Sequence, residues 1–215
     1  MTLPELEDGC RKALQNATDL LVDAQLLADG GGSPRAYALA HLALEELSKV
    51  TMLFRVGSQI QSGAEIDWKH LEKRFRSHKH KFWGSAFSAY VAEDRPAEQG
   101  AEELLSDLST AADHLSLKEA ALYVDMTSDG FTSPSERITS DATNALIKRA
   151  AAQVEFFRET LPIVLTSYYR DLTAAEKRMV TTMSRGDVPF DQALALLTVV
   201  RDVIRRDLST TDGEV

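Results

Sequence analysis

The fold is decided by the stretch AYALAHLALEELSKVTMLF, which runs from Ala36 to Phe54. Apolar residues cover almost every side of a helix drawn through this stretch, and such a helix is usually buried among other elements. Pro34 suits the first turn of the same helix, and the helical pattern continues to Ser62. The sequence therefore predicts a central, buried helix over residues 34–62.

Helical patterns extend outward on both sides of this segment. Apolar residues recur at steps of three and four from Leu3 to Leu27, and GGGSP ends that pattern. Asp67 is a candidate N-cap for a third helix, which we expect to continue without a break through Tyr90. A further helix is expected through Leu104 to Leu115, and it either continues or restarts from Leu117 to Val124. Another is expected over 139–169, after a polar loop at 125–137. Because no useful strand alternation occurs, the predicted fold class is all-α, a helical bundle with additional C-terminal helices.

The chain length of 215 residues suits one substantial domain with an appendage. We expect residues 1–171 to form the bundle and residues 172–208 to form a C-terminal helical extension. The last amphipathic helix of that extension is expected over 189–207, and residues 209–215 are expected to be a disordered tail.

The expected location is the cytoplasm. A single cysteine, Cys10, cannot form an internal disulfide and fits a reducing compartment, where we expect it to be a small core residue. The acidic start MTLPELEDG does not resemble a signal peptide, and no apolar run approaches the roughly 20 residues of a membrane span. We therefore expect no membrane partner.

The charge of the chain is unevenly distributed. The net charge is −9, but the segment Lys69 to Lys81, KHLEKRFRSHKHK, holds six Lys or Arg and one Glu. This local charge of +5 leaves −14 on the rest of the chain, which argues against a protein that coats nucleic acid over its whole surface. A phosphate-bearing partner should be attracted to this one segment.

The basic segment also contains the residue types that metal-independent RNA cleavage requires. A continuous helix would place Arg74 beside His78 and Arg76 beside His80, one turn apart. Guanidinium groups bind phosphate oxygens, and imidazole titrates near neutral pH and can carry protons. The alternative is a solvated basic helix face without a function. Under the functional interpretation the catalytic candidates are His78, His80 and Arg74, and the phosphate-binding candidates are Arg76, Lys79, Lys81 and Lys73.

A second group of polar residues lies on the central helix. His41, Glu45 and Lys49 follow one another at steps of four and form one polar stripe, with Glu46 beside it. One interpretation is a Glu45–Lys49 ion pair at the helix surface beside a core histidine. The other is that the stripe faces a polar pocket.

A third group occurs in KEAALYVDM, residues 118 to 126. Lys118, Tyr123 and Asp125 lie where a helix is expected to end, so the tyrosine and the aspartate form either a core residue and a cap or one wall of a pocket. The chain has no paired Glu-x-x-His motifs, no phosphate-binding loop of the Walker type and no dinucleotide fingerprint. We therefore expect neither a metal nor a cofactor.

Three segments together resemble the AbiV-type abortive-infection family, a branch of the helical HEPN superfamily. They are AHLALEELSKV at 40–50, SHKHKF at 77–82 and KEAALYVD at 118–125, which are similar in this order to that family's motifs. The resemblance covers roughly Leu3 to Tyr169. HEPN ribonucleases typically carry an arginine followed after four to six residues by a histidine, and Arg74 and His80, with five residues between them, fit this spacing.

The resemblance implies a role in prokaryotic defence and a compact helical bundle, commonly a homodimer, whose polar groove meets RNA or a nucleotide. The hypothesis is a phage-defence protein that cleaves RNA without a metal or binds RNA and so blocks translation. Its supporting pocket would consist of Glu45, Glu46, Lys49, His41, Lys118, Tyr123 and Asp125. A phage-encoded activator or an antitoxin is a further candidate partner. The alternative is a noncatalytic protein-interaction or nucleotide-binding module that sequesters a phage or host partner.

Overall fold

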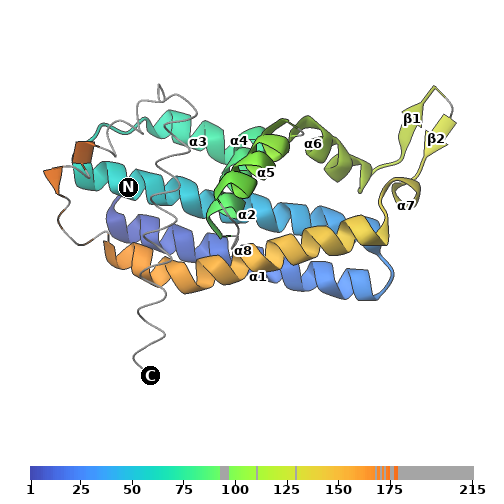
Figure 1. Cartoon of the computed structure of the whole chain (residues 1–215), viewed down its shortest axis with the longest axis horizontal. Coiled ribbons are helices and arrows are strands. Elements are labelled where there is room, and N and C mark those ends of the chain that lie inside the picture. The colour runs from blue at the N-terminus through green and yellow to red at the C-terminus, as the bar shows by residue number, and fades with distance from the viewer. Residues whose placement is uncertain are drawn as a thin grey trace.

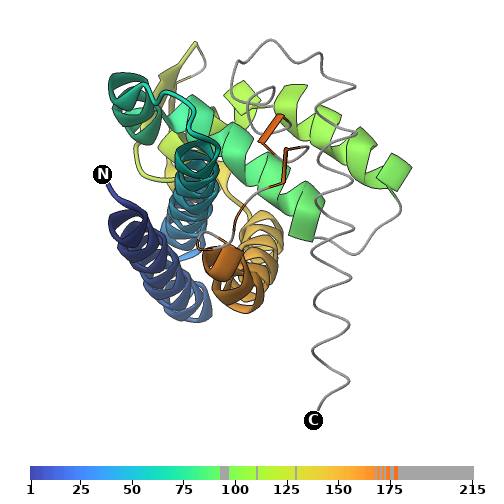
Figure 2. The ribbon, with the colours of Figure 1, turned by 90° about the vertical axis from the view of Figure 1, so that its left-hand side faces the viewer.

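The computed structural model describes residues 1–92, 97–109, 111–128 and 130–167, together with residues 169, 171, 173, 174, 177 and 178. Three long helices form the body of the molecule and run along its longest axis (Figure 1). They are α1 (Leu3–Asp29), α2 (Ser33–Ser62) and α8 (Ser140–Ser167). Seen from the end, α2 lies between α1 and the shorter helices, and α8 packs against both α1 and α2 (Figure 2). The described residues therefore confirm the predicted all-α class.

The helix α2 is the centre of the bundle, as its apolar sequence predicts. It packs against α1, α8 and α4 (His78–Ala92), so most of its circumference is covered. Pro34 lies in its first turn, and Gly63, with φ of 73°, ends it in the left-handed conformation that glycine adopts without strain. The apolar stripe of α1 is also confirmed, because Leu6, Cys10 and Ala17 have no exposed surface.

Shorter helices cover the α2 side of this body. These are α3 (Trp68–Arg76), α4, α5 (Ala97–Ser109) and α6 (Ala111–Ala120). The predicted N-cap of α3 is confirmed, because the Asp67 carboxylate accepts a hydrogen bond of 2.9 Å from the His70 amide. The side chain thereby satisfies an amide at the helix start that has no partner within the helix.

The prediction of one helix from Asp67 through Tyr90 is wrong. The backbone of Ser77 is extended, with φ of −86° and ψ of 114°, so α3 ends at Arg76 and α4 begins at His78. Serine competes for backbone hydrogen bonds and is common at helix boundaries. The helical register that would place Arg74 beside His78 and Arg76 beside His80 is therefore interrupted.

The expected loop at 125–137 is more regular than predicted. It contains an antiparallel hairpin of β1 (Asp125–Thr127) and β2 (Gly130–Thr132), followed by α7 (Pro134–Arg137). The hairpin extends beyond the end of the bundle (Figure 1), and Met126 and Phe131, which face each other across it, are 74% and 76% exposed. Residues 121–124, expected in a helix, form a turn and the approach to β1. Most of the predicted C-terminal extension lies outside the described residues, so the domain boundaries stay a prediction.

The helices α2 and α4 cross at an unusually close contact. A Cβ atom added to Gly84 of α4 would lie 2.9 Å from the Cβ of Ser48 on α2, which is closer than two such carbons approach. Ser48 is completely buried, so it has no room to withdraw. Glycine at position 84 therefore lets α4 lie close to α2, and the first turn of α4 lies near α2 as a result.

We expect Gly84→Ala to lower the free energy of unfolding by about 1–3 kcal/mol, because the added methyl group forces two packed helices apart. Urea denaturation measures this change. Gly9→Ala is the matched control, since Gly9 also lies within a helix and its added Cβ would meet only Leu53 Cδ1, at 3.0 Å. The better helix propensity of alanine should leave that control unchanged or more stable. Equal stability of the two variants would contradict the close-contact explanation.

Candidate functional site

The candidate site is built around one buried carboxylate. Glu45 lies in the middle of α2 and is only 1% exposed. A carboxylate is costly to bury unless cations and hydrogen-bond donors surround it. The donors come from α4 and α6, which are 33 to 73 residues away in sequence.

His78, the first residue of α4, contacts both oxygens of this carboxylate. Its Nδ1 lies 2.8 Å from Glu45 Oε1 and 2.9 Å from Oε2. In the tautomer that carries its proton on Nδ1, the ring donates to the carboxylate and Nε2 is left as the proton-accepting nitrogen; in the other tautomer, Nδ1 accepts from the Lys118 ammonium. The His78 side chain is 54% exposed. The first arrangement orients the imidazole and leaves a proton-accepting atom on an accessible ring.

Two lysines complete the cluster. Lys81 Nζ lies 2.5 Å from Glu45 Oε2, and Lys118 Nζ lies 2.8 Å from Oε1. Lys118 Nζ also lies 3.0 Å from His78 Nδ1, so the ammonium, the ring and the carboxylate meet at one point. The two lysine side chains are only 9% and 10% exposed. We call Glu45, His78, Lys81 and Lys118 the Glu45 cluster.

The charges of the Glu45 cluster do not cancel. One carboxylate faces two ammonium groups, which leaves a net charge of +1 even when His78 is neutral. Burial by itself would raise the pKa of Glu45, but the neighbouring His41 ring and the hydrogen bonds from Lys118, Lys81 and His78 outweigh burial and hold that pKa far below its ordinary value. Glu45 is therefore ionised, and the cluster keeps one positive charge in excess.

His41 lies on α2 one turn before Glu45, and its Nδ1 is 3.6 Å from Glu45 Oε1. Beside it is a cavity of about 10 Å³, bordered also by His114 of α6 and Arg149 of α8, which has room for about one water molecule. Burial lowers the pKa of His114. Arg149 forms an ion pair with Asp107 of α5. The sequence prediction missed His114, Arg149 and Asp107, because each is an isolated polar residue in an ordinary helical pattern.

Of the two interpretations of the polar stripe on α2, the surface pair is wrong. Glu45 does not pair with Lys49; Lys49 instead pairs with Glu46, and its Nζ lies 6.0 Å from the centre of the Phe75 ring. Successive residues on a helix are separated by about 100°, so Glu45 points inward while Glu46 lies nearer the surface. Of the predicted polar stripe, Glu45 therefore belongs to a buried cluster, whereas Lys49 belongs to a partly exposed ion pair with Glu46.

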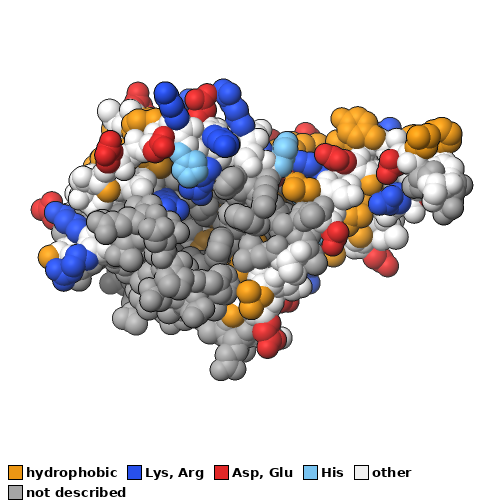
Figure 3. Space-filling view, turned by 90° about the horizontal axis from the view of Figure 1, so that it is seen from above, with side chains coloured by type: hydrophobic (Ala, Val, Ile, Leu, Met, Phe, Trp, Pro, Cys, Tyr) orange, Lys and Arg blue, Asp and Glu red, His pale blue; other side chains and the backbone are white. Residues whose placement is uncertain are grey.

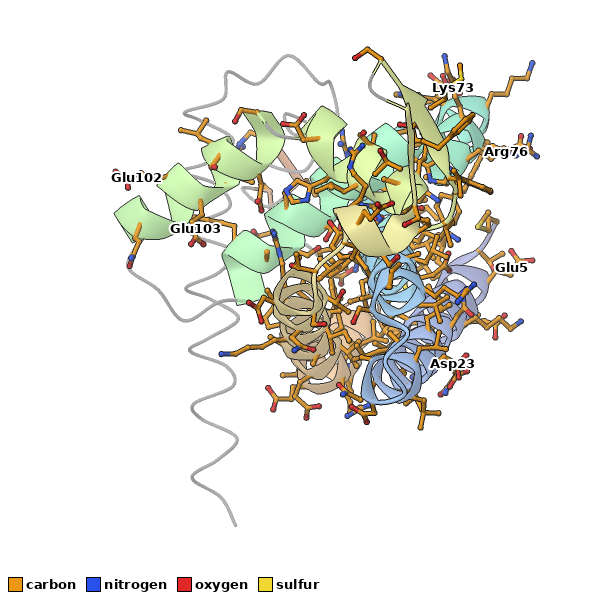
Figure 4. All side chains as sticks on the ribbon, turned by 90° about the vertical axis from the view of Figure 1, so that its right-hand side faces the viewer. Glu5, Asp23, Lys73, Arg76, Glu102 and Glu103 are labelled. Carbon is orange, nitrogen blue, oxygen red and sulfur yellow. The ribbon has the colours of Figure 1, made fainter. Side chains whose placement is uncertain are left out.

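The structure keeps several predicted residues of the basic segment away from the Glu45 cluster. Arg74 lies near Arg55 of α2, and burial together with that neighbouring charge lowers the pKa of Arg74. Arg76 pairs with Glu72 at 2.6 Å. Both Lys73 and Arg76 point away from the bundle (Figure 4). The side chains of Lys79 and His80 lie outside the described part of the structure.

Two residues of the third predicted group also lie elsewhere. The Tyr123 side chain is 66% exposed, just before the hairpin, so it is not a core residue. Asp125 lies in β1 with its carboxylate 4.0 Å from Arg137. From this group the structure brings only Lys118 to Glu45.

The surface above the cluster has a mixed character. Lysine, arginine and histidine side chains lie among acidic ones over α3 and the start of α4, and hydrophobic side chains gather at the hairpin end of the molecule (Figure 3). Within the described residues, no group of three or more His, Cys, Asp or Glu side chains is placed to hold a metal ion. No helix in the same part of the chain is long and apolar enough to cross a membrane.

Comparison with known proteins identifies the family. The HEPN_AbiV family model, described as AbiV, matches residues 5–155. No curated protein and no solved structure gives a significant match. The matched range contains all four residues of the Glu45 cluster. Because the model matches well over half of the chain, the protein belongs to the AbiV family of HEPN proteins.

Proposed function

We propose that the Glu45 cluster binds the RNA backbone and cleaves it without a metal, as the effector step of an abortive response to phage infection. The observation that carries this proposal is the pairing of the His78 ring with the buried Glu45 carboxylate at 2.8 Å, in a cluster with excess positive charge. AbiV family membership supports the defence role.

The geometry suits the base of a mechanism in which one group removes a proton and another donates one. A carboxylate that accepts from Nδ1 orients the imidazole and leaves Nε2 as its proton-accepting nitrogen. In the proposed reaction Nε2 of His78 removes the proton from a ribose 2′-hydroxyl, whose oxygen then bonds to the adjacent phosphorus. The bond from phosphorus to the 5′-oxygen breaks, and that oxygen takes a proton from a second acid, a role for which His80 stays the predicted residue.

The positive charge of the cluster suits the second requirement of the reaction, which is to stabilise negative charge on the phosphate. The transition state of this reaction concentrates negative charge on the phosphate oxygens. Lys81 and Lys118 are fixed in place by Glu45, so their field is already oriented before RNA binds. The first turn of α4 adds backbone amides, which favour an anion at a helix N-terminus.

We expect Lys81→Gln and Lys118→Gln each to weaken RNA binding and to reduce the slope of log K against log salt by about 0.7, because each removes one cation that attracts phosphate. Fluorescence anisotropy over a range of salt concentrations measures both quantities. Lys12→Gln is the control, since Lys12 pairs with Asp8 on the exposed side of α1. Salt slopes that stay unchanged in both cluster variants would exclude this cluster as the phosphate site.

A second candidate function, a noncatalytic module that sequesters another protein, is favoured by the hairpin. Exposed apolar side chains gathered in one place commonly mark an interaction surface. Besides Met126 and Phe131, the exposed apolar residues here are Leu122, Tyr123 and Val124.

The two functions predict opposite results for the double variant Met126→Ser with Phe131→Ser. Sequestration predicts that phage protection, measured as plaque counts, disappears while RNA binding is retained. Cleavage at the Glu45 cluster predicts that plaque counts stay at the wild-type level. The free energy of unfolding should change little in either case, because both side chains are exposed.

A further inference from the structure

A second concave surface lies between α4, α5 and α8, on the side of the molecule away from α1. Its volume is about 520 Å³, which is within the usual range for a site that binds a small molecule or one unit of a polymer. Glu103 on its α5 wall belongs to the outer helix seen in Figure 4. We call this surface the α5 cleft.

The walls of the α5 cleft combine small and flat side chains. Ala86 and Ala89 of α4 face Ala145 and Ala152 of α8, so no bulky side chain from these four positions fills the space. Tyr90 and Leu104 add a ring and an apolar side chain. A Cβ atom at Gly100 would lie 3.2 Å from the Tyr90 ring, so glycine lets α5 lie close to that ring without a tight contact. The Tyr90 ring and the small side chains around it suit a flat ring that can stack.

The electrostatics of the α5 cleft differ from those of the Glu45 cluster. Arg149 and Asp107 neutralise each other in an ion pair, and Lys148 and Glu103 contribute one charge of each sign. The charged residues of the lining therefore sum to zero, whereas the Glu45 cluster has an excess of +1. A phosphate is favoured at the cluster, and an uncharged group with both donors and acceptors is favoured in the cleft. A nucleobase has that chemistry.

The two sites are neighbours in the molecule, because a small cavity lies between them. The cavity of about 10 Å³ beside His41 and Glu45 shares Ala86 and Arg149 with the α5 cleft. Along α4, Ala86 follows His78 by eight residues, which corresponds to about 12 Å at the rise of an α-helix. A single strand of RNA spans this distance with a few nucleotides, so one strand can reach both sites.

We propose that the α5 cleft binds the base of an RNA nucleotide near the phosphate held at the Glu45 cluster, and that it sets the sequence preference of the protein. This inference rests on the proposed function, because it takes RNA to be the ligand. It assigns different parts of the RNA to different surfaces: the backbone to the cluster and one base to the cleft. The consequence is that the two surfaces control different measurable properties of binding.

The test uses two adjacent alanines of α8. Ala152 lines the cleft, whereas Ala151 does not, and both are exposed, so neither substitution overpacks the core. Binding of the full chain is measured with short oligomers of A, C, G or U. We expect Ala152→Leu to change the ratio of the dissociation constants of the weakest-bound and the tightest-bound oligomer by about tenfold, which is the effect of one stacked base. The slope of log K against log salt should stay unchanged. Ala151→Leu should preserve the wild-type ratio, and equal ratios in the two variants would overturn the proposal.

A second measurement keeps the cleft separate from the proposed function. The alanine methyl groups are labelled with ¹³C, and the protein is titrated with AMP, CMP, GMP and UMP. We expect at least one nucleotide to shift the methyl signals of Ala86, Ala89, Ala145 and Ala152 and to leave that of Ala151 in place. Unchanged signals with all nucleotides overturn the cleft assignment. If those signals do shift while Lys81→Gln and Lys118→Gln leave RNA binding unaltered, the proposed function fails and the base site stands.

Discussion

Glu45→Ala should lower the free energy of unfolding by about 3–5 kcal/mol, the usual cost of removing one partner from a buried ion pair. The substitution leaves the ammonium groups of Lys81 and Lys118 almost completely buried without their shared carboxylate. Urea denaturation at neutral pH measures the loss. The neighbouring variant Glu46→Ala is the control, because its ion pair with Lys49 is partly exposed and should contribute less than about 1 kcal/mol. Similar losses in the two variants would contradict a special role for Glu45.

The pH dependence of the free energy of unfolding tests the ionisation of Glu45 independently. The folded protein holds the pKa of Glu45 far below its ordinary value of 4.5, so the unfolded chain takes up the proton first as the pH falls. The stabilisation by this carboxylate is therefore complete above that ordinary value and is lost at lower pH. The difference in unfolding free energy between wild type and Glu45→Gln should narrow as the pH is lowered below about 4.5. A difference that stays constant over this range would mean that folding does not lower the pKa of Glu45.

The second large effect is expected at His78. His78→Ala should slow RNA cleavage by about 10²–10⁴-fold, the usual contribution of one positioned acid or base. The side chain is 54% exposed, and Glu45 keeps both lysines in its absence, so the free energy of unfolding should change much less than in Glu45→Ala. The rate of decay of a labelled RNA, measured with the purified variant, checks the first statement, and urea denaturation checks the second. A variant that unfolds as readily as Glu45→Ala would indicate a structural role instead.

The helices could be predicted where residues within the helix itself mark its core face and its ends. The apolar surroundings of Glu45 identify α2 as the central helix, and Pro34 and Gly63 mark its ends. The break at Ser77 could not be predicted in the same way, because no glycine or proline marks it. The hairpin strands have three residues each, which is too short for an alternating pattern to be recognised.

The sequence predicts the residues of the candidate site in three separate segments, but it does not predict which of these residues contact one another. Family-like segments supplied Glu45, His78, Lys81 and Lys118, and all four meet in the structure. Spacing within one helix could not decide whether Glu45 pairs with Lys49 or with residues from other helices, because that depends on which side of α2 is covered. Tyr123 belongs to the predicted pocket because it lies in the family-like segment at 118–125, together with Lys118. The chain turns toward the hairpin in between, so the two residues separate.

The most direct test of the proposed site is the chemical end that the full-length protein leaves on RNA in the presence of EDTA. Attack by the 2′-hydroxyl without a metal predicts fragments that end in a 2′,3′-cyclic phosphate, together with loss of these fragments in His78→Ala. Mass spectrometry of a short synthetic RNA after incubation distinguishes this end from a 3′-hydroxyl. Cleavage that requires a divalent metal, or cyclic phosphate ends that His78→Ala produces at the wild-type rate, would contradict catalysis at the Glu45 cluster.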